Sequence, residues 1–359
     1  MKTRVLIVIL ALMLAASSSG QEKVDSVTKR VFTTIVENAI TPVKNQSRSG
    51  TCWDYATVGF FEGEILRKTG KEYDLCEMFV ANKNYLEEAV FHVRLHGDSR
   101  FSEGGSADDV LSVVQKYGIC PEEAMPAPGS LIGDSLANFS EFFAVLTPYV
   151  QAVAKSKEKK LSKQWLTGCQ SILDAYLGKC PEQFVHEGKV FTPKSFAESL
   201  GLDWNDYISI TSFTHHPFKT WFVIEAPYKW RPQLSYNVPL EEMMSIIDTA
   251  LYNGFNVCWG GDVSGNGFDR KGFAMEQETP SQELRQQRLD QWDASYDHVM
   301  LIFGKAKDQD GHEYYMVKNS WGEFGEYEGI WYMSKNYIAF NTTYVFLNRN
   351  AVDRLKELK

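Results

Sequence analysis

TPVKNQSRSGTCWDYATVGFFEGEIL, residues 41–66, holds the helix signal around which the rest of the chain is organised. Apolar residues recur at helical spacing from Trp53 to Ile65, which predicts a helix packed on one broad face. Ser49 and Thr51 are candidate N-caps, and Asp54 falls in the first turn, where a helix start favours negative charge. The stretch therefore predicts a loop that enters a core helix at Cys52.

Cys52 stands at a position where a thiol can become reactive. The unpaired N–H groups and the dipole of a helix start favour the thiolate, which is the nucleophilic form of cysteine. Gln46 lies six residues upstream, and its side-chain NH2 could point to the same place as the Cys52 N–H. Two such donors beside a nucleophile form an oxyanion hole for acyl transfer. The alternative is a buried packing cysteine preceded by an ordinary loop amide, since most free cysteines are inert.

The composition is that of a globular protein with a large core. The 359 residues are 44% hydrophobic and 13% aromatic, which suffices for one large domain or two. The formal net charge is −9, and an acidic balance argues against binding to a nucleic-acid backbone. No nucleic-acid partner is therefore expected.

The first twenty residues have the layout of a secretory signal peptide. Two basic residues precede an apolar run from Val5 to Ala15, and small residues follow up to Gly20. The run is too short to span a bilayer, and no later segment approaches spanning length. We therefore expect residues 1–20 to be removed, a mature domain over residues 21–359 without a membrane anchor, and a secreted or periplasmic location.

The cysteines and histidines give no clear metal signal. The six cysteines contain no CxxC pair, so zinc is not predicted, and no cofactor is expected. A disulfide such as Cys169 to Cys180 is an option that spacing alone cannot settle. His215 and His216 are adjacent, and neighbouring residues of a strand point to opposite faces, while no carboxylate or cysteine follows at ligand spacing. No metal site is expected there.

Helical patterns dominate the first half of the chain and strand patterns the second. Helices are expected over residues 72–93, over 108–116, twice within 135–186, over 241–254, and as an exposed helix over 280–293. From about residue 190, short aromatic and β-branched stretches separated by turn residues indicate strands. The two helices within 135–186 are interpreted as an inserted layer over about residues 130–190.

Two further stretches contribute candidate site residues. His298 opens HVMLIFGKAKD and Asn319 closes EYYMVKN, so an antiparallel hairpin would bring both to the same end. The Asn319 side-chain oxygen could then fix the tautomer of the His298 ring, and Trp321 could shield that bond from water. Gly104-Gly105, ahead of a helix, is either an ordinary tight turn or a place where another backbone approaches closely.

Several motifs resemble those of the papain-like cysteine peptidases over nearly the whole mature chain. They are Gln46 with Cys52-Trp53, Gly104-Gly105 followed by a helix and KYGI, then DHVMLIFG and KNSWG, in that order. The stretches QSRSGTCW, DLCEMFVANKNYLE and ALYNGFNVCWGGDV, with 246 residues between Cys52 and His298, are most similar to the bleomycin hydrolase and aminopeptidase C branch.

The resemblance implies an α+β, two-lobed fold with a cleft between the lobes. A helical lobe would carry Cys52, and an antiparallel, barrel-like lobe would carry His298 and Asn319. It also implies roles for the site residues: Cys52 as nucleophile, His298 as general base and then acid, Asn319 as its orienter, Gln46 as oxyanion donor, and Gly104, Gly105 and Trp321 as substrate-binding residues.

The expected function is hydrolysis of peptide bonds through a Cys52 thioester, with aminopeptidase action implied by the resemblance. In that branch a C-terminal arm enters the cleft and meets the substrate's amino group, whereas this chain ends in a shorter, basic segment up to Lys359. An endopeptidase or an acyltransferase on the same site, and a catalytically silent binding protein with this fold, are the alternatives. Peptides are the expected partners, and homo-oligomers, which the branch often forms, are an option.

Overall fold

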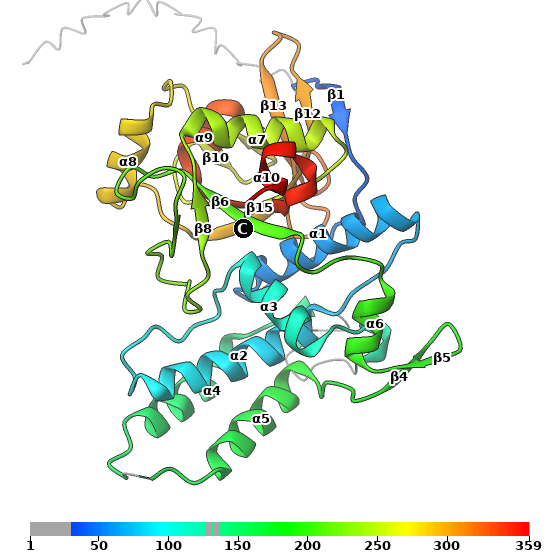
Figure 1. Cartoon of the computed structure of the whole chain (residues 1–359), viewed down its shortest axis with the longest axis vertical. Coiled ribbons are helices and arrows are strands. Elements are labelled where there is room, and N and C mark those ends of the chain that lie inside the picture. The colour runs from blue at the N-terminus through cyan, green and yellow to red at the C-terminus, as the bar shows by residue number, and fades with distance from the viewer. Residues whose placement is uncertain (1–29, 126–130, 133–135, 159, 359) are drawn as a thin grey trace, which may run out of the picture. The chain divides into compact units, whose positions relative to one another are not determined.

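The helical and strand-rich parts of the chain separate in space as well as in sequence (Figure 1). The computed structural model describes residues 30–125, 131–132, 136–158 and 160–358, so the expected signal peptide at residues 1–20 lies outside the described residues. Residues Phe32–Lys359 form one compact unit. Within this unit, the helices α2 to α6 lie on one side of α1, and the large sheet lies on the other.

The helices α1 to α5, α7 and α8 form where the apolar spacing predicted helices, with bounds that differ by a few residues, whereas α6, α9 and α10 were not predicted. The helices of the described part are α1 (Cys52–Thr69), α2 (Glu77–Arg94), α3 (Ala107–Tyr117), α4 (Ser140–Ala154), α5 (Gln164–Leu177), α6 (Pro193–Ser199), α7 (Leu240–Tyr252), α8 (Gln282–Asp290), α9 (Lys335–Asn341) and α10 (Asp353–Lys356), with 3-10 turns at Glu122–Ala124 and Arg349–Ala351. The helices α4 and α5 fall in the stretch interpreted as an inserted layer.

Strands concentrate after residue 200. The strands are β1 (Thr33–Glu37), β2 (Leu131–Ile132), β3 (Leu136–Ala137), β4 (Phe184–His186), β5 (Lys189–Phe191), β6 (Tyr207–Thr211), β7 (Trp221–Phe222), β8 (Ser235–Asn237), β9 (Val257–Gly261), β10 (Phe268–Asp269), β11 (Phe273–Ala274), β12 (His298–Lys307), β13 (Glu313–Lys318), β14 (Ile330–Ser334) and β15 (Thr342–Asn348). The small ladders β2–β3 and β4–β5 stand apart from the large sheet.

The large sheet has the strand order β10-β11-β14-β13-β12-β9-β15-β6-β8-β7, and β1 pairs with the far half of β12. Its pairs are antiparallel except β11 with β14 and β6 with β8, which are parallel. Within the described residues the two end strands do not pair with each other, so the expected barrel-like lobe is an open sheet. The fold class is otherwise the α+β arrangement that the sequence predicted.

The central strands are buried on both faces, which explains their nearly continuous apolar sequences. In β12, Val299 and Leu301 join the core that contains α1. Met300 and Ile302 alternate with them and join the core beneath α7 and α9. Alternate side chains of a strand point to opposite faces, so one strand serves two cores. His298 is the first residue of β12, where the strand reaches the cleft that Cys52 also lines.

The helix α1 is buried on all sides, whereas the sequence predicted a single broad buried face. Every residue from Cys52 to Ile65 except Tyr55 is buried, because the sheet covers one side and the helices α2 and α3 cover the other. Thr51 takes the N-cap position, but its hydroxyl bonds to the Ser49 hydroxyl and does not cap the helix. Asp54 lies in the first turn, as predicted, and is fully buried at 0% exposure.

The expected exposed helix at 280–293 is wrong in part. Within α8, Arg285 is 1% exposed, and its guanidinium donates to backbone carbonyls of Ser212, Ala339, Phe340 and Thr342. Burial lowers the pKa of Arg285 to about 9. A buried charge is tolerated only when such acceptors replace its water. Through Arg285, the helix α8 thus holds in place the turn that follows β6.

All six cysteines are free, so the considered Cys169 to Cys180 pairing does not form. The helix α5 carries the chain from Cys169 to Leu177 over roughly 12 Å, at 1.5 Å of rise per residue, and Cys180 then contacts the Phe79 carbonyl of α2. A disulfide needs Cα atoms within roughly 7 Å. In the described part of the chain, no helix combines the length and apolarity needed to span a bilayer.

Candidate active site

The predicted nucleophile lies in the wall of a cleft. Cys52 is the first residue of α1 and is 9% exposed. Burial raises the pKa of its thiol to about 12, and backbone N–H groups of Val299 and Trp53 act in the opposite direction. The prediction that the helix start makes this thiol more acidic is therefore wrong in net direction, because loss of solvent outweighs the N–H groups. The resting group is a neutral thiol that needs a base.

Gln46 is held beside Cys52 by hydrogen bonds to the other half of the molecule. Its Nε2 donates to the Ser49 carbonyl at 2.7 Å, and its Oε1 accepts from the Ser320 hydroxyl at 2.6 Å. The Gln46 backbone N–H also donates to the Ser320 carbonyl at 2.8 Å. These bonds fix the amide orientation, so one Nε2 hydrogen remains for the cleft that Gln46 and Cys52 both line.

His298 and Asn319 meet at one end of the β12–β13 hairpin, where the pairing of Leu301 with Lys318 places them. The distance from His298 Nε2 to Asn319 Oδ1 is 2.8 Å. Asn319 Oδ1 also accepts from the Ser320 N–H at 2.8 Å, which identifies that atom as the oxygen. The His298 Nε2 is therefore the protonated nitrogen, and the lone pair lies on Nδ1.

The environment of His298 favours the neutral imidazole. The side chain is buried, and burial lowers its pKa to about 4, against a smaller opposing effect of the Asn319 hydrogen bond. Trp321 packs beside the ring, with 5.0 Å between ring centroids and 35° between the planes. A neutral base with a fixed tautomer is ready to take a proton from a neutral thiol.

Gly104 and Gly105 also form part of the wall of the cleft, and an aromatic ring packs against each of them. A Cβ at Gly104 would lie 2.2 Å from the Tyr228 ring, and a Cβ at Gly105 would lie 2.8 Å from the Trp53 ring. The groups that approach the glycines are aromatic side chains, whereas the sequence predicted another backbone. The Trp53 indole N–H donates to the Glu103 carbonyl at 2.9 Å and anchors this wall to α1.

The cleft has a volume of about 440 Å³ and brings together six of the seven predicted site residues: Gln46, Cys52, Gly104, Gly105, His298 and Trp321. The seventh, Asn319, is buried behind His298. The cleft is also lined by Arg100, Glu103, Tyr228, Tyr296 and Asp297, which sequence reasoning did not assign. Of these five residues, only Asp297 had a sequence signal, its position next to His298.

Asp297 directly precedes the first residue of β12. The residue is exposed in the cleft, and its Oδ1 accepts from the Val263 N–H at 3.0 Å. Partial enclosure of the carboxyl raises its pKa to about 6. In the first turn of α1, Asp54 is buried, and burial and nearby Glu77 hold its pKa well above the ordinary value.

The chain is similar to known peptidases along almost its full length. The profile of the Peptidase C1-like family matches residues 8–357. Aminopeptidase E of Lactobacillus helveticus is 23% identical, with 95% of this chain and 88% of the relative covered. Aminopeptidase G of Lactobacillus delbrueckii subsp. lactis is 25% identical, with 89% and 83% covered. Mitochondrial cysteine proteinase 1 of Saccharomyces cerevisiae is 24% identical, with 86% and 74% covered.

The solved structure of PepW from Lactobacillus rhamnosis HN001 has the same fold. Its TM-score is 0.75 at 21% sequence identity, and the match covers 90% of this chain and 83% of PepW. The family profile matches nearly the whole chain, and the motifs named above supply the residues that line the cleft. The chain belongs to the Peptidase C1-like family, in the aminopeptidase C and bleomycin hydrolase branch of the papain-like cysteine peptidases.

Proposed function

We propose that the protein is a cysteine aminopeptidase that works through a Cys52 thioester. The observation that carries the proposal is one cleft lined by a thiol, an amide donor and an imidazole whose Nε2 is fixed 2.8 Å from Asn319 Oδ1. Each group suits one step of acyl transfer, and their polarity matches the charges that develop.

In the proposed mechanism, His298 Nδ1 takes the Cys52 thiol proton as the sulfur attacks the peptide carbonyl carbon. The carbonyl oxygen becomes an oxyanion, stabilised by the Gln46 side-chain N–H and the Cys52 backbone N–H. The C–N bond then breaks, and His298 returns the proton to the leaving amine. Water, deprotonated by the same Nδ1, attacks the thioester and releases the carboxylic acid and the thiol.

Aminopeptidase action requires a group that binds the substrate's ammonium. The C-terminal segment is held at the sheet, because Leu355 of α10 is buried against it and the Leu358 carbonyl accepts a hydrogen bond from Arg349. We therefore look for the ammonium-binding group among the residues that line the cleft. Within the described residues, the carboxylates that line the cleft are those of Glu103 and Asp297. Each of the two accepts one backbone N–H, Glu103 from Gly50 at 2.5 Å and Asp297 from Val263 at 3.0 Å, but Asp297 is exposed in the cleft whereas Glu103 is half-buried. We therefore assign the ammonium to Asp297, directly beside the base.

The test compares one peptide with a free and with an acetylated amino terminus, using the full mature chain. The aminopeptidase proposal expects kcat/KM to be at least about tenfold higher for the free form, equivalent to about 1.4 kcal/mol. Equal rates would contradict aminopeptidase action and leave an endopeptidase, and products joined to an added amine would reveal acyl transfer.

The thioester step has its own control among the cysteines. Cys52→Ala should remove turnover of both peptides, and alkylation of the wild type should do the same. Cys180 is the cysteine outside the cleft that is only partly buried, so Cys180→Ala is the matched variant and should keep activity. Turnover by Cys52→Ala would exclude the proposed nucleophile.

Export is part of the proposal because the first twenty residues have the three-part layout of a signal peptide. In the native host, the protein recovered outside the cytoplasm should begin near Gln21 when its N-terminus is measured by mass spectrometry. A cytoplasmic product that retains residues 1–20 would contradict this.

A further inference from the structure

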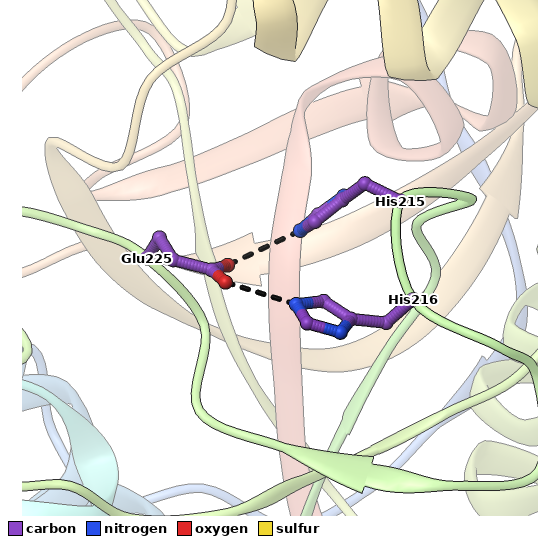
Figure 2. Close-up of side chains that lie close together, drawn as sticks. All are labelled: His215, His216 and Glu225. Atoms are coloured by element: carbon purple, nitrogen blue, oxygen red, sulfur yellow. Dashed lines mark hydrogen bonds and ion pairs between the residues drawn. The ribbon is translucent and has the colours of Figure 1, made fainter.

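A second cluster of chemically active side chains lies where the turn between β6 and β7 meets the segment that follows β7. His215 Nε2 is 3.1 Å from one carboxylate oxygen of Glu225, and His216 Nε2 is 2.9 Å from the other (Figure 2). The ligand atoms of all three residues lie within 4.8 Å of one another. The two histidines occupy a turn and not a strand, so both rings can face one carboxylate. The two adjacent histidines can therefore share one ligand site in this turn, which the sequence prediction for a strand excluded.

The two rings are held in place by neighbours. His216 stacks on Phe222, with ring centroids 4.1 Å apart and 26° between the planes. His215 packs edge-on against the same ring at 5.6 Å. The positions of both Nε2 atoms are therefore largely fixed before any ligand binds, which reduces the entropy cost of binding.

His215 faces hydrogen-bond acceptors on both of its ring nitrogens. Its Nδ1 lies 3.3 Å from Gln286 Oε1. That amide is oriented independently, because its oxygen accepts from the Thr214 N–H at 2.7 Å and its nitrogen donates to Asp290 at 2.8 Å. The Nδ1 must then carry a proton, and the Nε2 lone pair of a neutral ring would point at a carboxylate oxygen. A cation between Nε2 and Glu225, either a proton or a metal ion, resolves this conflict.

We propose that His215 Nε2, His216 Nε2 and the Glu225 carboxylate form a Zn²⁺ site. Imidazole nitrogen and carboxylate oxygen are ligands that Zn²⁺ prefers, and two histidines with one glutamate leave a fourth position for water. Bond lengths of about 2.0–2.2 Å give tetrahedral ligand separations of roughly 3.3–3.6 Å, a few tenths of an ångström longer than the contacts of 3.1 and 2.9 Å that the two rings make with the two oxygens of Glu225. The Nδ1–H to Gln286 bond is the outer-shell contact typical of a zinc-bound histidine.

The site can exchange metal with solvent and borders the active-site region. The side chains of His215, His216 and Glu225 are 31%, 34% and 63% exposed. Glu225 and His215 line a cavity of about 650 Å³ that shares Tyr228 and Asp297 with the cleft. A bound ion would tie the turn after β6 to the segment that carries Tyr228, the ring against Gly104.

A second group, Asp308, Asp310 and His312, also has ligand spacing among the described residues. Its Asp308 carboxylate already accepts from the backbone N–H groups of Asp310 and His312 at 3.0 and 2.9 Å, as expected of a hairpin turn. These bonds explain its geometry without an ion, so this group carries no proposal.

The test is calorimetric titration of Zn²⁺ into the full-length mature protein without a histidine tag. The protein carries Cys52→Ala so that the thiol in the cleft cannot bind the metal. We expect one ion per chain at micromolar or tighter Kd, and Co²⁺ should give the visible absorption of a tetrahedral site. Glu225→Gln keeps the side-chain size and should weaken binding at least tenfold, and His216→Ala should do the same. Glu241→Gln, an exposed glutamate on α7, should not.

Circular dichroism of each variant checks that it is folded. Absence of Zn²⁺ binding by the parent protein would overturn the proposal and leave an imidazolium–carboxylate pair as the cation that His215 requires. Binding that survives both Glu225→Gln and His216→Ala in folded proteins would also overturn it, because the ion would then sit elsewhere.

Discussion

His298 and His215 are the same side chain in two environments with opposite consequences. His298 is buried, and its Nε2 faces the neutral oxygen of Asn319. His215 is exposed, and its Nε2 faces the charged carboxylate of Glu225. Burial is the main reason why the His298 ring stays neutral, and the amide oxygen orients the ring without stabilising a positive charge as strongly as a carboxylate does. A carboxylate favours a cation on the ring, so the exposed pair is suited to holding one.

The comparison teaches that burial and the group that faces Nε2, and not the histidine itself, separate a ring suited to proton transfer from a ring suited to holding a cation. Acyl transfer needs a base that accepts and returns a proton in each cycle. A metal ligand needs a ring whose lone pair stays committed to the ion. The following predictions test this division.

The largest effect should come from removing the buried ring. His298→Ala should lower kcat/KM by about 10²- to 10⁴-fold, the usual contribution of general base catalysis. The measurement is steady-state hydrolysis of a free-amine peptide. His312→Ala at the hairpin tip is the matched control and should stay near wild type, because that ring is 71% exposed. A small loss in His298→Ala would remove His298 from the mechanism.

Changing the partner of His298 should be the next largest effect. Asn319→Ala should lower kcat/KM about 10- to 150-fold, since one hydrogen bond to a group that becomes charged contributes about 1.5–3 kcal/mol.

Asn319→Asp would give His298 the kind of partner that His215 has. The carboxylate should raise the His298 pKa from about 4, and the acid limb of kcat/KM against pH should shift upward with it. An unchanged limb would mean that another group controls the profile. In the wild type, the folded pKa lies below the ordinary 6.5, so the native state binds fewer protons between these values. The stability contributed by His298 therefore falls as the pH drops from 6.5 through 4.

On the exposed side of the comparison, Gln286→Leu should weaken Zn²⁺ binding about 10- to 100-fold, the usual cost of losing an outer-shell partner. The variant removes the acceptor of His215 Nδ1 without touching a proposed ligand. Gln287→Leu, one position along α8 and exposed, is the matched control. Equal affinities for the two variants in titration would show that Gln286 does not orient the ring.

The smallest effect should be that of Asp297→Asn. If the Asp297 carboxylate binds the substrate's ammonium, the preference for free over acetylated peptides should fall about fivefold, as for an ion pair worth about 1 kcal/mol. The wild type should also lose kcat/KM for free-amine peptides as the pH falls through about 6, where this carboxyl takes a proton. Asp293→Asn, exposed and outside the cleft, is the control. A preference that survives would assign the ammonium to another group.

The sequence predicted those parts of the site that local pattern controls. The cysteine at a helix start and the histidine and asparagine at the ends of a hairpin follow from spacing, because hydrogen-bonded secondary structure determines where their backbones lie. The burial of α1 on all sides was not predictable from its own sequence, because it depends on layers supplied by residues far along the chain.

The metal-binding candidate was missed for the same physical reason. His215, His216 and Glu225 share no periodic element. They converge because α8 holds the turn in place. Arg285 donates a hydrogen bond to the Ser212 carbonyl, and the Gln286 side chain accepts one from the Thr214 N–H. Tertiary contacts of this kind leave no regular spacing in the sequence.

Ser320 has a consequence for how the enzyme fails. Its N–H bonds to the oxygen that orients His298, and its hydroxyl bonds to Gln46 in the loop before α1. Separation of the two halves would therefore disable the base and the oxyanion donor together. A nicked or partly denatured molecule should therefore lose its activity and should not become a less specific protease. The measured activity then reports whether the two halves are intact and assembled.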